Sequence, residues 1–220
     1  MTATQPKRLR VLVACEYSGV VRDWFTTLGH DAISCDLLPS ERPNGKHHQG
    51  DVLDLITARP DGYFDLMIAH PSCQYLANSG AKHLYIEKTD EDGKKYRSQE
   101  RDPARWAAME EAAEFYRLLW DASIEKIAIE NPIMVGHARR LIGIDQKRHF
   151  VQPWQFGHGE CKATGFDLRG LSPLIPTNIV EGRSQNVHRM SPGPDRWRDR
   201  SRTFEGIGEA MASQWGGDAR

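Results

Sequence analysis

Two short clusters of reactive side chains each follow an apolar run of the sequence. Residues 70–74 read His-Pro-Ser-Cys-Gln and contain the thiol of Cys73, and the second cluster is Glu130, Asn131 and a proline. A thiol that drives hydrolysis needs a histidine as its base, whereas a carboxylate beside a thiol suits a substrate that is gripped or protonated at a ring nitrogen. A pyrimidine is such a substrate, because its C6 accepts a thiolate and protonation at N3 eases the addition. The saturated adduct is then nucleophilic at C5.

The apolar runs around these clusters predict an α/β fold with a mostly parallel sheet. Buried strands are expected at 11–15, 32–35, 47–52, 65–69 and 126–129, helices at 20–28, from 103 to about 120 and at 206–215, and a C-terminal antiparallel hairpin from 149–156 and 164–171. Ligands bind beyond the carboxyl ends of the strands in such sheets. The thiol and the carboxylate are therefore expected to face one pocket. The polar stretch 81–105 predicts a mobile loop or an insertion.

Length and composition favour one globular domain over residues 1–220. The 220 residues are 39% hydrophobic and 27% charged. The net charge of −1 gives no indication of a nucleic-acid partner. The first residues lack the apolar core of a signal peptide, and no run is long enough to span a bilayer. Four separated cysteines without a CxxC pair argue against a zinc site and a disulfide framework. We expect a cytoplasmic protein with no metal and no membrane partner.

In their order and strand context, the clusters resemble the motifs of the DNA cytosine-C5 methyltransferases over roughly residues 9–215. That family has a Pro-Cys motif after strand four, a Glu-Asn-Val motif after strand five, and an acidic residue after each of strands two and three. The counterparts here are residues 71–74, residues 130–132, Asp36 and residues 50–52. The resemblance implies a Rossmann-like fold that binds S-adenosylmethionine.

The resemblance also implies a role for each residue. Cys73 adds to C6 of the target cytosine, Glu130 holds N3 and the exocyclic amine, and Asn131 braces that turn. Asp36 binds the ribose hydroxyls of S-adenosylmethionine, and Asp51 binds its adenine amino group. Because C5 and C6 are buried in a duplex, the implied DNA substrate is flipped out or single-stranded.

Further positions complete the expected site. The remaining cofactor-binding candidates are Glu16, Ser18, Gly19 and Pro71, and the substrate-binding candidates are Gln74, Ser79, Lys82, Thr164, Arg196 and Arg200. The family's glycine-rich turn is reduced here to a single glycine, which leaves open how the methionine end of the cofactor is held. Lys162 is a catalytic candidate, because it stands where the family has the first of two arginines and Thr164 stands at the second. A lysine lacks the bidentate contact of an arginine.

The family's long target-recognition region is reduced here to an arginine-rich remnant at 172–203. Residues 183–202 hold six arginines and two aspartates, a net charge of +4. Such a strip suits phosphates but has little surface for reading bases. We therefore expect DNA binding, to double or single strands, with weak sequence selectivity.

Two alternatives remain open. One keeps the fold but uses a carboxylated S-adenosylmethionine, which would carboxymethylate the base, and a spare cation near the sulfonium would favour it. The other is a catalytically inactive protein that binds DNA or cofactor. His70 and His158 are expected to be structural, and Cys15, Cys35 and Cys161 to be packing residues.

Overall fold

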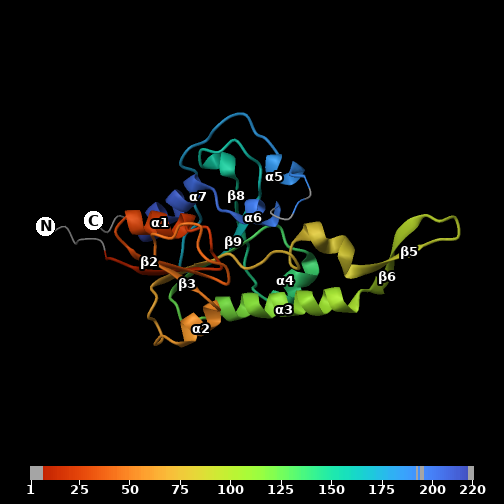
Figure 1. Ribbon diagram of the computed structural model, residues 1–220, viewed down its shortest axis with the longest axis horizontal. Coiled ribbons are helices and arrows are strands. Elements are labelled where there is room, and N and C mark those ends of the chain that lie inside the picture. The colour runs from red at the N-terminus through yellow and green to blue at the C-terminus, as the bar shows by residue number, and fades with distance from the viewer. Residues whose placement is uncertain (1–6, 192, 194–195, 218–220) are drawn as a thin grey trace.

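A seven-stranded sheet forms the centre of the computed structural model, which describes residues 7–191, 193 and 196–217 (Figure 1). Its strands are β1 (Arg10–Ala14), β2 (Asp31–Asp36), β3 (His47–Gln49), β4 (Leu66–Ala69), β7 (Lys126–Asn131), β8 (His149–Val151) and β9 (Thr164–Arg169). They lie in the order β3-β2-β1-β4-β7-β9-β8, and β9 runs antiparallel to both of its neighbours. The expected α/β class, with a mostly parallel sheet and a C-terminal antiparallel hairpin, is confirmed.

The central strands are apolar on both faces because helices cover both. In β1, Leu12 packs in a core cluster with α2 (Val52–Thr57), α3 (Pro103–Trp120) and α4 (Gly136–Ile142). Val13, on the opposite face of β1, packs in a second cluster with α1 (Val20–Thr27) and α7 (Glu205–Met211). Figure 1 shows these two helical layers on either side of the sheet. Strands buried in this way read as continuous apolar runs rather than alternating ones, which is why the sequence identified them.

The longest helix begins where its capping residues predict. The carboxylate of Asp102 accepts a hydrogen bond from the backbone nitrogen of Arg105 at 2.9 Å, and Pro103 occupies the first turn. The predicted C-terminal helix is α7 followed by a π-helical turn, η3 (Ala212–Gly216). The remaining short elements are η1 (Asn78–Leu84), η2 (Pro153–Gln155), α5 (Asn186–Arg189) and α6 (Arg196–Ser201). In the described ranges, no helix combines the length and apolar composition needed to cross a lipid bilayer.

Three predicted elements differ from the structure. The strand expected at 47–52 ends at Gln49, because the side chain of Asp51 caps α2 instead. The strand expected at 149–156 ends at Val151, because Pro153 opens a 3₁₀ turn. Much of the stretch expected as a loop or insertion forms a two-stranded antiparallel hairpin, β5 (Tyr85–Thr89) and β6 (Lys95–Arg101), which projects from one end of the molecule (Figure 1).

Candidate active site

The carboxyl ends of β4 and β7 bring the two reactive clusters together. These strands pair in parallel up to Ala69 and Ile129, so the segments that follow leave the same edge of the sheet. The side-chain amide of Asn131, which is fully buried, donates a hydrogen bond to the carbonyl of Pro71 at 3.1 Å. This bond joins the Cys73 loop directly to the Glu130 loop.

The carboxylate of Glu130 lies in a charged and mostly enclosed position. Its side chain is 17% exposed, and Nδ1 of His70 lies 3.5 Å from Glu130 Oε2. Burial alone would raise the pKa of Glu130, but the hydrogen bond and charge of His70, together with Lys162 and Arg148, hold it below its usual range. His70, expected to be structural, therefore contacts the key carboxylate. Its Nε2 is buried and has no hydrogen-bond partner in the described part of the chain.

The thiol of Cys73 reaches solvent from a crowded recess. Burial in that recess and the nearby Glu130 raise its pKa, whereas the charges of Lys162 and Arg200 lower it. A thiolate is the nucleophilic form of cysteine. Lys162 and Arg200 therefore favour the thiolate form.

Lys162 reaches this edge from the segment between β8 and β9. Its ammonium group donates a hydrogen bond to the carbonyl of Arg200 at 2.7 Å, and the hydroxyl of Thr164 donates to the carbonyl of Lys162 at 3.1 Å. Both residues line a cavity with His70 and Glu130, closed on the other side by residues 201–211 of the C-terminal segment. The cavity measures about 10 Å³, close to the minimum that one water molecule requires.

A buried network that the sequence analysis missed holds the turn after Glu130. The guanidinium of Arg148 donates to the carbonyls of Asn131, Pro132 and Gly165 at 2.7, 2.8 and 2.6 Å. Arg148 is in turn 3.2 Å from the fully buried carboxylate of Asp167. The same carboxylate accepts hydrogen bonds from two further side chains, Arg139 at 2.9 Å and Tyr116 at 2.6 Å. The sequence offered one signal, Asp167 within the predicted hairpin strand at 164–171, but not its burial, which is what makes a partner necessary.

A second arginine holds the Cys73 loop. Nη2 of Arg105 donates to the carbonyl of Gln74 at 2.6 Å, and its guanidinium lies 4.4 Å from the centre of the Tyr75 ring. The guanidinium also fills the space beside Gly80, where a Cβ atom would come within 2.7 Å of it. Each reactive loop thus has an arginine bound to its backbone.

The other predicted substrate contacts are less closely gathered. Gln74 and Ser79 are exposed on the loop and on η1. Lys82 is also exposed, and its charge contributes to the lowered pKa of Glu87 in the hairpin. Arg196 lies at the start of α6, one turn before Arg200, the residue of that pair whose charge acts on Cys73.

The predicted cofactor turn is ordered by its own side chains. The carboxylate of Glu16 accepts hydrogen bonds from the backbone nitrogens of Val21 and Arg22, at 2.8 and 3.3 Å, and from the hydroxyl of Ser18 at 3.2 Å. Burial raises the pKa of Glu16. Gly19 has a φ of +74° beside the Arg22 guanidinium, where a Cβ atom would lie 2.5 Å away. Glu16 and Ser18 therefore shape the turn from inside.

Two further carboxylates flank this turn at the strand ends. Asp36 accepts from the backbone nitrogen of Leu38 at 2.9 Å, and Asp51 accepts from that of Leu53 at 2.8 Å. Burial, followed by the charges of both aspartates, raises the pKa of Cys35 to about 12. Both carboxylates therefore lie near one patch at the ends of β1 and β2.

This edge of the sheet fits S-adenosylmethionine by the chemistry of its groups. Glu16 already occupies backbone amides at the start of α1, where a nucleotide phosphate would otherwise bind. Asp36 and Asp51 offer acceptors to hydroxyl and amino groups and a negative field to a cation. A ligand with a ribose, an adenine amine and a sulfonium matches that set.

The sequence matches no protein-family model and no curated protein sequence. Solved structures with a similar fold include a putative DNA modification methyltransferase encoded within an E. coli prophage, at 15% identity and a TM-score of 0.47, covering 84% of this chain and 55% of that one. An Entamoeba histolytica methyltransferase, EhMeth, has 16% identity and a TM-score of 0.44, covering 85% and 61%. A Spodoptera frugiperda DNMT2 mutant has 10% identity and a TM-score of 0.38, covering 80% and 56%. The chain therefore spans little more than half of each of these structures.

Proposed function

We propose that this chain is an S-adenosylmethionine-dependent transferase that methylates C5 of cytosine in DNA through a covalent Cys73 adduct. The observation that carries the proposal is the meeting of a thiol, a carboxylate and a lysine, Cys73, Glu130 and Lys162, at one edge of the sheet. Beside them lies the acceptor-rich edge formed by Asp36 and Asp51. A thiol-and-carboxylate pair suits addition to a pyrimidine better than hydrolysis.

The chain's own residues can carry the addition. The thiolate of Cys73 forms a bond to C6, and the electron pair of the C5–C6 double bond moves to C5, which becomes nucleophilic. Glu130 holds N3 and the exocyclic amine, and His70, whose Nδ1 lies 3.5 Å from Glu130 Oε2, positions that carboxylate. After C5 has gained the methyl group, a water molecule takes the C5 proton, the C5–H electron pair re-forms the C5–C6 double bond, and the C6–S bond breaks to release the Cys73 thiolate.

The residues proposed to bind the cofactor lie at the same edge of the sheet. Asp36 would bind the ribose hydroxyls and Asp51 the adenine amine, while the turn ordered by Glu16 and Ser18 would face the methionine end, beside Gly19 and Pro71. S-adenosylmethionine, when bound, supplies a methyl group on a positively charged sulfur, which a nucleophilic C5 can accept. The cavity beside Glu130 has room for about one water molecule, so few waters compete for that carboxylate on this side.

DNA is the substrate that the surface charge supports. Residues 172–203 would serve as a reduced, arginine-rich substitute for a target-recognition region within a single catalytic domain. Arg200 links that strip to the reaction, because its backbone binds Lys162 and its charge lowers the pKa of Cys73. Backbone contacts to phosphate carry little sequence information, so weak selectivity is expected.

The adduct can be trapped with DNA that contains 5-fluorocytosine, because fluorine at C5 blocks release of the thiol. With S-adenosylmethionine present, wild-type protein should give a protein–DNA band that survives denaturation. Cys73→Ala should give none, and Cys161→Ala, which removes another thiol, should behave as wild type. DNA binding without any such band would refute the covalent mechanism. A Cys73→Ala variant that keeps its full biological effect would instead favour a binding protein.

A second candidate is transfer of a carboxymethyl group from a carboxylated S-adenosylmethionine. The buried Nε2 of His70 favours it, because this atom has no hydrogen-bond partner in the part of the chain that the structure describes and lies on a ring that contacts Glu130, where an additional carboxylate could bind. Mass spectrometry of nucleosides from cells that express the protein distinguishes methylcytosine from carboxymethylcytosine. The Cys73→Ala variant supplies the blank.

A further inference from the structure

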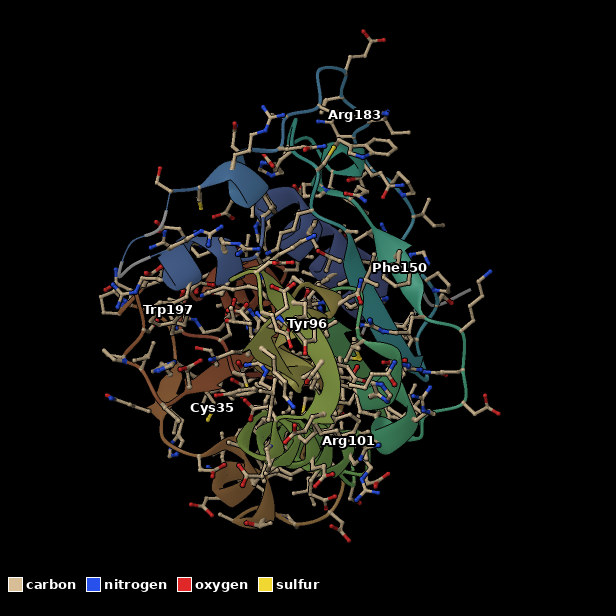
Figure 2. The ribbon with its side chains drawn as sticks, turned by 90° about the vertical axis from the view of Figure 1, so that its right-hand side faces the viewer. Cys35, Tyr96, Arg101, Phe150, Arg183 and Trp197 are labelled. Carbon is tan, nitrogen blue, oxygen red and sulfur yellow. The ribbon has the colours of Figure 1, made fainter. Side chains whose placement is uncertain are left out.

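An exposed indole lies on the helix that covers the candidate active site. Trp197 of α6 is 55% exposed, and its ring lies 6.2 Å from that of Tyr17 in the turn after β1 (Figure 2). The Tyr17 hydroxyl donates to the carbonyl of Arg198 at 2.9 Å and lies 2.8 Å from Ser201 Oγ. Because Lys162 also binds α6, this helix is tied to both sides of the site. The charge of Arg200 also acts on the thiol of Cys73, so α6 lies beside that thiol.

The arginines around Trp197 differ in their partners. Arg198 and Arg202 pair with Glu41, at 4.0 and 2.7 Å. By contrast, the guanidinium groups of Arg196 and Arg200 make no hydrogen bond or ion pair within the described residues, and Nε of Arg196 is buried without a partner there. Trp197 and Arg200 are three residues apart, so they share one side of the helix, about 4.5 Å apart along its axis.

Other exposed aromatic rings lack this setting. Tyr96, 48% exposed, lies on the projecting hairpin opposite Lys88, which pairs with Glu100. Phe150, 44% exposed, lies on β8, where the nearby guanidinium of Arg148 is already bound to the Glu130 turn. Figure 2 shows the three rings on separate parts of the surface. Of the three rings, Trp197 is the most exposed; Arg198 lies 5.9 Å from its centre, and the neighbouring guanidinium groups of Arg196 and Arg200 have no partner among the described residues.

We propose that Trp197, with Arg196 and Arg200, is a stacking platform for an unpaired base next to the target cytosine, and that the substrate is single-stranded DNA. The assignment of DNA rests on the proposed function of the same site. A ring face accepts any base, while neighbouring cations bind the backbone, as in proteins that hold single strands without sequence preference. A duplex keeps its bases stacked inside and offers α6 only phosphates.

Binding of a short single-stranded oligonucleotide that carries 2-aminopurine tests the platform without any catalysis. Stacking on Trp197 should quench the 2-aminopurine fluorescence. Trp197→Ala should weaken single-strand binding by about 5- to 150-fold, the loss of one stacked base, and Trp197→Phe should recover most of it. Tyr96→Ala and Phe150→Ala should bind as wild type. A duplex of the same sequence should bind Trp197→Ala and wild type equally.

The salt dependence of oligonucleotide affinity distinguishes the contribution of the Trp197 ring from that of the two arginines. Arg196→Gln and Arg200→Gln should each reduce the slope of log affinity against log salt by about 0.7, the value for one phosphate on a single strand. Trp197→Ala should leave that slope unchanged. Unchanged single-strand binding by Trp197→Ala overturns the proposal, as does an equal loss on single and double strands. Weaker S-adenosylmethionine binding with intact oligonucleotide binding also overturns it, because the ring would then cover the cofactor. None of these readouts requires Cys73 to react, so failure of the adduct experiment is a separate result.

Discussion

Two groups of arginines in this protein do opposite work. Arg22 and Arg148 are 0% and 9% exposed, and their guanidinium groups form hydrogen bonds and ion pairs with hydroxyls, carbonyls and carboxylates of the protein itself. Arg196 and Arg200, on α6, leave their guanidinium groups without such partners in the described residues. A buried guanidinium costs free energy unless it is fully paired, so the first group fixes loops. The second group stays available to an external anion.

The largest effect should come from breaking the buried group. Asp167→Ala removes the carboxylate that faces Arg148 and Arg139, and it leaves an uncompensated charge in the core. The free energy of unfolding should fall by about 3–5 kcal/mol, measured by urea denaturation. Tyr116→Phe removes only one hydrogen bond to the same carboxylate and should cost about 1 kcal/mol. Equal losses in the two variants would show that the charge pairing is unimportant.

Replacing arginine by lysine should have different effects in the buried group of arginines and in the group on α6, because only the buried group depends on guanidinium geometry. Arg148→Lys keeps the charge but loses the planar, two-pronged guanidinium whose two Nη atoms reach the three carbonyls. We expect a shifted Glu130 turn and 5-fluorocytosine adduct formation slowed by about 100-fold, with DNA affinity unchanged. Arg200→Lys should slow adduct formation far less, because a phosphate accepts either cation. If both exchanges slow it equally, the distinction between fixing and binding arginines is wrong.

The cations near Cys73 should have a smaller, pH-dependent effect. Burial raises the pKa of Cys73, so its alkylation by iodoacetamide should accelerate with pH beyond the ordinary thiol value of about 8.5. Lys162→Met removes a charge that favours the thiolate, so the rate profile should move to higher pH. At pH 7.5 the rate should fall by roughly two- to fivefold, and Arg200→Gln should have a weaker effect in the same direction. Cys73→Ala supplies the background from other thiols.

The smallest effect should come from a paired surface arginine. Glu41→Gln removes the carboxylate that Arg202 contacts with two nitrogens, at 2.7 and 2.9 Å. Because both partners are partly exposed, the free energy of unfolding should change by less than about 1 kcal/mol, and 1 M salt should remove the difference. The Arg202 contact lowers the pKa of Glu41, so this contribution is present at neutral pH and is lost on acidification. A change like that of Asp167→Ala would place this pair in the buried group.

The sequence predicted the strands and the meeting of Cys73 with Glu130 because both depend on short-range patterns. Apolar runs identify buried strands, and parallel strands bring their carboxyl ends to one edge. It missed Arg148 and Arg105, because their acceptors are backbone carbonyls, which composition does not reveal. It also missed the β5–β6 hairpin. Cross-strand ion pairs, such as that of Glu87 with Arg97 at 2.8 Å, stabilise a segment whose polarity suggests a loop.

The two attachments of α6 would link the proposed ligands thermodynamically. Tyr17 holds the helix from the turn after β1, and Lys162 holds it from the side of Cys73. Any ligand that tightens one attachment changes how the helix presents itself to the other ligand. Such a coupling is reciprocal. If bound S-adenosylmethionine raises the affinity for a DNA strand, the strand must raise the affinity for S-adenosylmethionine by the same factor, and the protein would bind the two cooperatively.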